Sequence, residues 1–284
     1  MKIGFIGAGK AGCSLGKYFS QKTLPDCSVI GFYSKEFDDA VWAANFTNSK
    51  YFTSLEALVS ECDTIIISTQ DSVIEFIWRI IPKEALKGKI ICHLSGSLSS
   101  DVFSDRESYG AYGISIHPLF AFSNKESVYK QLNNVYFTLE GDSYAIKIWQ
   151  KLLSDTGNQS CLINKTDKIK YHAAASILSN HVLAVIDCGY QLLMSCGFDE
   201  LQARNFTADL IITNISHAVE RGTVNALTGP IERCDAGTVK KHLYQLEDSQ
   251  REIYYSCGKR LLEMAQQKNP DHDYSVMKKI LKME

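Results

Sequence analysis

The sequence lacks the cysteine patterns that stabilise small secreted folds or bind structural zinc. It has nine cysteines, an odd number, and no two of them form a C-x-x-C pair. Disulfide frameworks need paired cysteines and structural zinc sites need closely spaced ones, so we expect neither a disulfide framework nor a metal site. Most of these cysteines have apolar neighbours, which predicts reduced thiols in the core.

An excess of one charge and long apolar stretches are missing as well. The 30 basic residues nearly balance the 32 acidic ones, and no basic block occurs, which argues against nucleic acid as a partner. The N-terminus has no apolar signal region, and no apolar run approaches the ~20 residues of a membrane span. We therefore expect a soluble, cytoplasmic protein without a membrane partner.

Strand and helix patterns alternate in the first half of the chain, which is typical of a parallel sheet covered on both faces. The fold class that we expect is α/β, with a Rossmann domain over residues 1–158 and an all-helical substrate or dimerisation domain over 159–284. The expected strands are 2–6, 29–33, 64–68, 90–94, 112–116 and 135–139. The expected helices of this half are 10–21, 36–46, 54–61 with Ser54 as its cap, 72–81 and 142–154.

The second half begins with one long helix, from Asp167 to Met194. Between those ends its only charged residues are Lys168, Lys170 and Asp187. A helix that is apolar nearly all round is normally buried, so we expect other helices to cover it. The candidates for this cover are 199–220, 236–247, 249–268 and 273–283.

A glycine turn of the form G-x-G-x-x-G follows the first strand directly and precedes a helix. Gly7 allows the tight turn, Gly9 allows close approach of a pyrophosphate, and Gly12 allows the helix to pack on the strand. An ordinary tight turn is the alternative, but the order of strand, turn and helix favours a dinucleotide site. The predicted phosphate-binding residues are Gly7, Ala8, Gly9, Lys10, Ala11 and Gly12.

The residues at the tip of the second strand favour NADP over NAD. Ser34 and Lys35 offer a hydroxyl and a cation, which suit a 2′-phosphate, where NAD-binding units carry an acid. Lys35 as a solvated loop residue is the alternative. Thr69 and Gln70 follow the strand 64–68 and are further cofactor-binding candidates, although Gln70 and Asp71 could instead cap the next helix.

Polar residues that follow two later strands are candidates for the substrate side. Ser95 and Gly96 offer a hydroxyl and an open backbone N–H near the expected nicotinamide position. His117 ends its strand before a proline, so a structural turn role stands beside a substrate-binding or catalytic one.

The long helix carries a polar row. His172, Ser176 and Asn180 recur every four residues, so they share one face. Buried polar groups need partners, which could be substrate or an interhelical hydrogen-bond network.

A Rossmann domain followed by a long helix with such a row resembles the 6-phosphogluconate, hydroxyisobutyrate and ketopantoate reductase group. In ketopantoate reductase a lysine followed by two asparagines at four-residue spacing acts as general acid and substrate clamp. The matching residues here are His172, Ser176 and Asn180. The histidine departs from the family lysine, but imidazole also delivers a proton near neutral pH.

The whole chain resembles more closely a branch of Rossmann-like oxidoreductases with a C-terminal helical domain of unknown function. The resemblance rests on three segments, which are His117–Phe122, Lys168–Asn180 and Thr228–Asp235. Members of this branch are described as NADP-dependent oxidoreductases. The third segment normally has glycine where this chain has Cys234, a departure that could alter the turn.

The segment Thr228–Asp235 interrupts two helices and gathers Glu232, Arg233 and Asp235. Arg233 could bind an anionic substrate through its planar guanidinium, or it could form an internal ion pair with either acid. Three functions remain open from the sequence, and the third of them is a structural dimer module that uses the helical domain. The first is an NADP-dependent oxidoreductase acting on a small carbonyl, hydroxy or imine compound, with His172, Asn180 and Ser95 at the reaction centre. The second is a non-catalytic NADP(H) sensor. For each function the resemblance and the apolar helix predict a homodimer through the helical domain.

Overall fold

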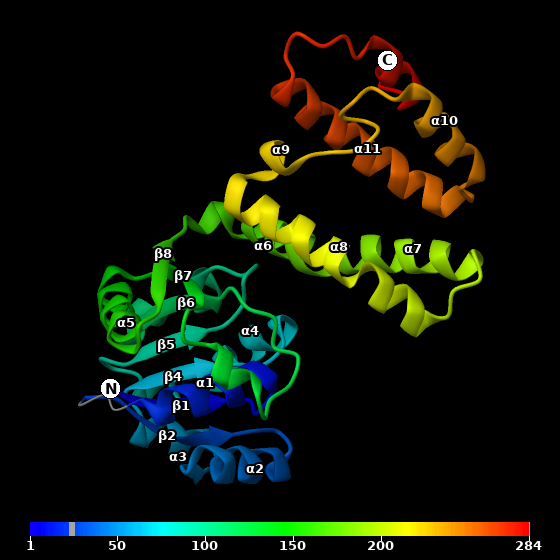
Figure 1. Ribbon diagram of the computed structural model, residues 1–284. Coiled ribbons are helices and arrows are strands. Elements are labelled where there is room, and N and C mark those ends of the chain that lie inside the picture. The colour runs from blue at the N-terminus through cyan, green and yellow to red at the C-terminus, as the bar shows by residue number, and fades with distance from the viewer. Residues whose placement is uncertain (23–25, 284) are drawn as a thin grey trace. The chain divides into compact units, whose positions relative to one another are not determined.

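The computed structural model describes residues 1–22 and 26–283 and divides into two compact units, Met1–Ser179 and Asn180–Glu284. The first unit contains an eight-stranded sheet with the order β3-β2-β1-β4-β5-β6-β7-β8 (Figure 1). Its strands are β1 (Lys2–Ile6), β2 (Ser28–Tyr33), β3 (Lys50–Tyr51), β4 (Thr64–Ile67), β5 (Ile90–His93), β6 (Tyr112–Pro118), β7 (Tyr136–Gly141) and β8 (Gln159–Leu162).

Most neighbouring strands of this sheet are parallel. The pair β6 and β7 is the antiparallel exception, since Ile116 lies opposite Leu139. The parallel strands β1, β4, β5 and β6 therefore end at one common edge of the sheet. The predicted α/β class with a mainly parallel sheet is confirmed.

Helices cover both faces of the sheet, because its central strands are apolar on both sides. Side chains of α1 (Lys10–Gln21) and α5 (Ser143–Thr156) share one core with alternate strand residues such as Phe5 and Phe32. Side chains of α3 (Leu55–Glu61) and α4 (Asp71–Ile80) form the other core with Ile65 and Ile67. The helix α2 (Phe37–Thr47) packs beside α1 and β2. Ser54 caps α3 as predicted, accepting a hydrogen bond from the Ala57 N–H at 3.2 Å.

The first unit also contains the start of the long helical segment. After β8 the chain forms α6 (Lys168–Ser176), followed by a π-helical stretch, η6 (Ile177–His181). The predicted domain boundary after residue 158 falls between α5 and β8, whereas the compact units divide after Ser179. The later division arises because β8 pairs with β7 in the sheet, and because Lys168 donates hydrogen bonds to Ser95, which follows β5, and to Ser115 of β6.

The second unit is helical. It contains α7 (Val182–Ser195), α8 (Glu200–Arg221), α9 (Thr223–Ala226), α10 (Ala236–Gln245), α11 (Asp248–Lys268) and α12 (Ser275–Ile280). A small core lies among α10, α11 and α12 and includes Val239, Leu262 and Met277.

The expectation that other helices of the chain bury the long helix is wrong. None of the residues of α7 is fully buried, and Leu178 before it is 78% exposed. The segment Lys165–Ser195 is long and apolar enough to cross a membrane by length and composition, a test that core helices of globular proteins also pass. An apolar composition predicts that a helix is covered, but it does not say by which molecule.

All nine cysteines lie in the described residues and are free. Cys13, Cys62 and Cys92 are buried, whereas Cys161, Cys196 and Cys257 are exposed, so fewer of them lie in the core than expected. Cys234 adopts a left-handed backbone conformation with φ of 54°. Glycine adopts this geometry without strain, which fits the glycine that the resemblance leads us to expect at this position.

Candidate active site

The glycine turn is held against the end of β4. Gly7 has φ of +100° and donates its N–H to the Tyr33 carbonyl at 2.8 Å. The hydroxyl of Ser68 donates to the Gly7 carbonyl oxygen at 2.9 Å. A side-chain carbon at Gly12 would lie 2.3 Å from Ser68 Oγ, so only glycine fits there. These contacts give Gly7 and Gly12 the roles that the turn pattern predicts.

Gly9 differs from Gly7 and Gly12, because a side-chain carbon at Gly9 would have no protein atom closer than 3.9 Å. It is the N-cap of α1, and no side chain caps that helix end. A cavity of about 410 Å³ adjoins it, lined by Ala8, Gly9, Lys10, Asp39 and residues 123–126. Open space beside uncapped backbone N–H groups fits a phosphate group, so the residues present suit a dinucleotide.

The other predicted cofactor residues lie at the same edge of the sheet. Ser34 and Lys35 follow β2, where the Lys35 side chain is 96% exposed and lies 4.0 Å from Glu36. Thr69 and Gln70 follow β4. A side-chain carbon added at Gly7 would lie 3.1 Å from the methyl carbon of Thr69, so the two residues are close neighbours. Gln70 is the N-cap residue of α4 but makes no side-chain cap bond. Contacts of these four residues with a cofactor stay predictions.

Gly96, His117 and His172 meet beyond the carboxyl ends of β5 and β6. A side-chain carbon at Gly96 would lie 2.7 Å from His172 Nδ1 and 2.9 Å from His117 Nε2. The two imidazole rings are 6.0 Å apart between centroids and nearly perpendicular. The structure thus brings together three residues that the sequence places far apart in the chain.

The ring of His117 is fixed and uncharged at neutral pH. Its Nδ1 lies 2.7 Å from the Tyr171 hydroxyl. Burial, followed by the positive charge of Lys168, lowers the pKa of His117 to about 4. A neutral imidazole can donate one hydrogen bond and accept another, which suits orientation of a polar substrate group.

Lys168 is the residue of this site that the sequence argument missed. Its side chain is buried, with 1% exposure, and Nζ donates to the Ser95 carbonyl at 3.1 Å and to Ser115 Oγ at 2.5 Å. Burial lowers the pKa of Lys168 to about 8, against the opposing charges of Glu140 and Asp71. The signal was present in the sequence, because a lysine in an apolar helix needs a polar partner when it is buried.

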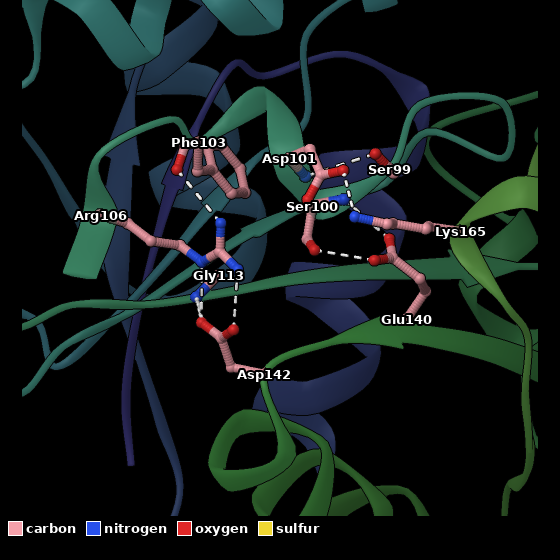
Figure 2. A network of polar contacts seen from close by, with 9 residues as sticks. All are labelled: Ser99, Ser100, Asp101, Phe103, Arg106, Gly113, Glu140, Asp142 and Lys165. Carbon is pink, nitrogen blue, oxygen red and sulfur yellow. Dashed lines mark hydrogen bonds and ion pairs between the residues drawn. The ribbon is translucent and has the colours of Figure 1, made fainter.

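A second polar network holds the loop after β5 (Figure 2). The buried carboxylate of Glu140 accepts hydrogen bonds from the Ser100 N–H at 2.7 Å and from the Ser100 hydroxyl at 2.8 Å. Arg106 donates to both oxygens of Asp142, each at 2.8 Å. Because two carboxylates from the β7 end anchor this loop, the segment that begins at Ser95 has a defined position.

The hydroxyl of Ser95 is fully committed within the protein. It donates to Asp71 Oδ2 at 2.6 Å and accepts the N–H groups of Ser97 and Leu98 at 3.1 and 3.0 Å. Ser95 is therefore held in place, and its hydroxyl orients Asp71. Direct contact of Ser95 with substrate stays a prediction.

The rest of the polar row follows His172 along the helix. Ser176 ends α6, and Asn180 is exposed within η6. A π-helical stretch has more residues per turn than an α-helix, so the three residues of the predicted row do not lie on one regular helix. A shared role of His172, Ser176 and Asn180 stays a prediction.

Arg233 lies in the second unit, where its side chain is exposed. The neighbouring acids have other partners. Glu232 accepts a hydrogen bond from Asn269 at 3.1 Å and lies 3.7 Å from Lys268, while Asp235 caps α10 through the Thr238 N–H. Among the described residues Arg233 forms no ion pair within 4.0 Å, which leaves its guanidinium available.

Two family models match the chain. Residues 2–95 match the family described as NADP oxidoreductase, coenzyme F420-dependent, and residues 135–261 match a domain of unknown function, DUF2520. Each match covers less than half of the chain. The matches confirm the predicted resemblance to NADP-dependent oxidoreductases with a helical domain of unknown function. No curated protein matches the chain.

Solved structures resemble nearly the whole chain. A candidate NADP oxidoreductase of Bacteroides fragilis has a TM-score of 0.72 at 20% identity, over 92% of this chain and 98% of its own. An imine reductase of Myxococcus stipitatus in complex with NADP+ has a TM-score of 0.65 at 13% identity, over 99% and 100%. The NADP-bound pyrroline carboxylate reductase of Plasmodium falciparum has a TM-score of 0.60 at 14% identity, over 93% and 99%. At these identities the likeness shows the fold.

Proposed function

We propose that this NADP oxidoreductase transfers hydride between NADP(H) and a small carbonyl, hydroxy or imine compound. The observation that carries the proposal is the meeting of Gly96, His117 and His172 at the sheet edge to which the glycine turn also belongs. Ligands of open α/β sheets bind at this edge. The NADP-bound imine and pyrroline carboxylate reductases of the same fold support a C=N or C=O substrate.

The glycine turn holds the cofactor phosphates in this proposal, through the N–H groups of residues 7–12. Ser34 and Lys35 hold the 2′-phosphate, and Thr69 and Gln70 contact the bound nucleotide. When bound, the cofactor supplies or accepts the hydride. The exposed ammonium of Lys35 suits this role, because Glu36 at 4.0 Å does not neutralise it by close contact.

His172 moves the proton that accompanies hydride transfer. Its Nδ1 side faces Gly96, and imidazole exchanges protons near neutral pH. Lys168 is a positioning residue, because its buried ammonium fixes the Ser95 carbonyl and hence the peptide that leads to Gly96. His117 orients the substrate as a neutral imidazole, and Ser176 and Asn180 extend the binding surface along the helix. Binding of an anionic substrate group by Arg233, a residue of the second unit, stays a prediction.

A second copy of this chain covers the apolar helices and forms a homodimer. Phe206, Leu210 and Val219 of α8 are 73%, 70% and 81% exposed, and Leu183 of α7 is 64% exposed. Apolar surface of this extent marks an interaction site. A protein partner fits better than a bilayer, because the segment Lys165–Ser195 also carries Lys170, His172 and Asp187, which are costly in hydrocarbon.

The location that we propose for the protein is the cytoplasm. Free thiols at all nine cysteines support this location, because the cytoplasm keeps thiols reduced.

The test begins with NADPH and NADH titrations, followed by a panel of carbonyl and imine compounds. His172→Ala is expected to lower turnover by about 10²–10⁴-fold with NADPH affinity unchanged. His272→Ala, which removes a histidine that packs on Tyr274 in the second unit, is the matched control. Unchanged turnover in His172→Ala would remove the assigned role. Tight NADPH binding without oxidation across the panel would instead favour a non-catalytic sensor.

A further inference from the structure

Asp71 presents an oriented carboxylate at the mouth of the candidate active site. It is the first residue of α4, directly beyond β4, and it is exposed. One oxygen, Oδ2, accepts the hydroxyls of both Ser95 at 2.6 Å and Ser97 at 2.8 Å. Within residues 1–22 and 26–283 the other oxygen, Oδ1, makes neither a hydrogen bond nor an ion pair. Capping of α4, the role that the sequence suggests for Asp71, accounts for none of these contacts.

The hydrogen bonds of Ser95 keep this carboxylate in place. Two backbone N–H groups, from Ser97 and Leu98, point at Ser95 Oγ. A hydroxyl has one hydrogen and two lone pairs, so the single hydrogen of Ser95 points at Asp71. Together with the hydroxyl of Ser97, this hydrogen bond fixes the orientation of the carboxylate.

Among the described residues no cationic side chain forms an ion pair with Asp71, and the charge of Lys168 acts on it without direct contact. His117 and His93 both have a pKa lowered to about 4, chiefly by burial, so both rings are neutral near pH 7. The ammonium of Lys168 is buried and directed to the Ser95 carbonyl and Ser115. A carboxylate that is fixed, solvent-accessible and unpaired beside neutral imidazoles is a receptor for a positive charge.

We propose that Asp71 Oδ1 is the subsite for a cationic nitrogen, and that the substrate is a protonated imine whose reduced form is an amine. The proposal rests on the proposed function, because it names the substrate class of the same site. The imine carbon accepts a hydride from NADPH, the C=N π pair moves to the nitrogen, and NADPH becomes NADP+. The product of this step is a neutral amine. It takes up one proton through His172, which recovers it from solvent, so the positive charge next to Asp71 is restored.

This arrangement also separates imines from carbonyl compounds. A fixed anion stabilises an iminium cation over a neutral ketone of the same shape. It also disfavours an anionic group at that position, because like charges repel. The site therefore selects its substrate by the charge on the reacting nitrogen.

The test compares pyrrolidine, a cation at neutral pH, with cyclopentanone, a neutral molecule of the same shape. Binding of each compound to the purified full-length protein, in whichever oligomeric state it has, is measured by ligand-detected NMR in the presence of NADP+. We expect pyrrolidine to bind at least about tenfold more tightly, and we expect Asp71→Asn to remove that preference while cyclopentanone binding stays the same. Ser97→Ala is the matched control, because it removes one hydrogen bond but keeps the carboxylate.

Several outcomes overturn the proposal. These are equal binding of the two probes to the wild type, no binding of pyrrolidine at high millimolar concentration, and an equal loss of both probes in Asp71→Asn. Loss of NADP+ affinity in Asp71→Asn without loss of NADPH affinity would also overturn it, because Asp71 would then serve the nicotinamide cation. The NADPH titration of the wild type is the separate test of the proposed function, since failure there removes the oxidoreductase and failure of the probes removes only the substrate class.

Discussion

The two units of the chain bury their apolar side chains to very different degrees. In the first unit Phe5, Phe32 and Trp149 are completely buried between the sheet and its helices. In the second unit α7 has no buried residue and α8 has only Ala203. The comparison shows that a single chain buries the apolar side chains of the sheet, whereas it leaves the apolar side chains of α7 and α8 exposed.

The difference does not extend to the whole second unit. Val239, Leu262 and Met277 of α10, α11 and α12 are fully buried in a core of their own. Many of the exposed large apolar residues lie on α7, α8 and the helical stretch before them, although Tyr244 of α10 and Val276 of α12 are exposed as well. Selective exposure of two helices beside a well-packed core indicates a binding surface and not a poorly folded region.

The largest effect is expected from a charge on this surface. Leu210→Glu puts a carboxylate on the exposed face of α8 and should dissociate the proposed dimer, since a buried unpaired charge costs several kcal/mol. Phe76→Glu, at a residue of α4 that is 57% exposed in the first unit, is the matched control and should leave the assembly unchanged. Sedimentation velocity reads out both variants. Dissociation by both changes, or by neither, would contradict an interface on α8.

A smaller and pH-dependent effect is expected from the buried lysine of the first unit. The pKa of Lys168 is lowered to about 8 in the folded protein, so between that pH and its ordinary value the unfolded chain binds more protons. The destabilising charge is present below about pH 8, and stability is regained as the pH rises from about 8 to 10.5. Lys168→Met lacks this charge, so this gain in stability with rising pH is absent from the variant.

The measurement is urea unfolding of the wild type and Lys168→Met at several pH values from 7 to 10.5. The stability difference between them should change in favour of the wild type as the pH rises. Lys170→Met, on the exposed side of the same helix, serves as the control and should show no pH-dependent difference. If the stability difference between the wild type and Lys168→Met did not change with pH, the ammonium of Lys168 would not be destabilised in the folded protein.

The smallest effect is expected at the left-handed turn of the second unit. Cys234→Gly should raise the free energy of unfolding by about 1 kcal/mol, because glycine adopts positive φ without a steric penalty. Thermal unfolding of the two proteins measures the change, with Cys257→Ser as a control for the loss of a thiol. A loss of stability in Cys234→Gly would mean that the weak contact of its thiol with the Asp273 carbonyl outweighs the strain.

Local patterns in the sequence were sufficient to predict the sheet and its glycine turn. The helix predicted over 10–21 agrees with α1, and each predicted strand agrees with an observed one within two residues. The strands β3 and β8 were missed, since Lys50–Tyr51 has only two residues and Gln159–Leu162 begins with two polar ones. Neither segment has the apolar run that identifies a buried strand.

Contacts across the sequence were harder to predict. His117 and His172 were identified separately, but nothing local indicated that both rings border Gly96. The role of Lys168 depends on Ser95 and Ser115, two residues from different strands whose loops meet only in the fold. The π-helical stretch that contains Asn180 has no reliable sequence signature.

Gly96 has a consequence for the sequences of related proteins. Any side chain at this position would collide with both His117 and His172. The three positions should therefore change together during evolution, so that a relative with alanine or serine in place of Gly96 has lost at least one of the two histidines. An alignment of relatives could test this dependence without any purified protein, and independent variation at the three positions would contradict it.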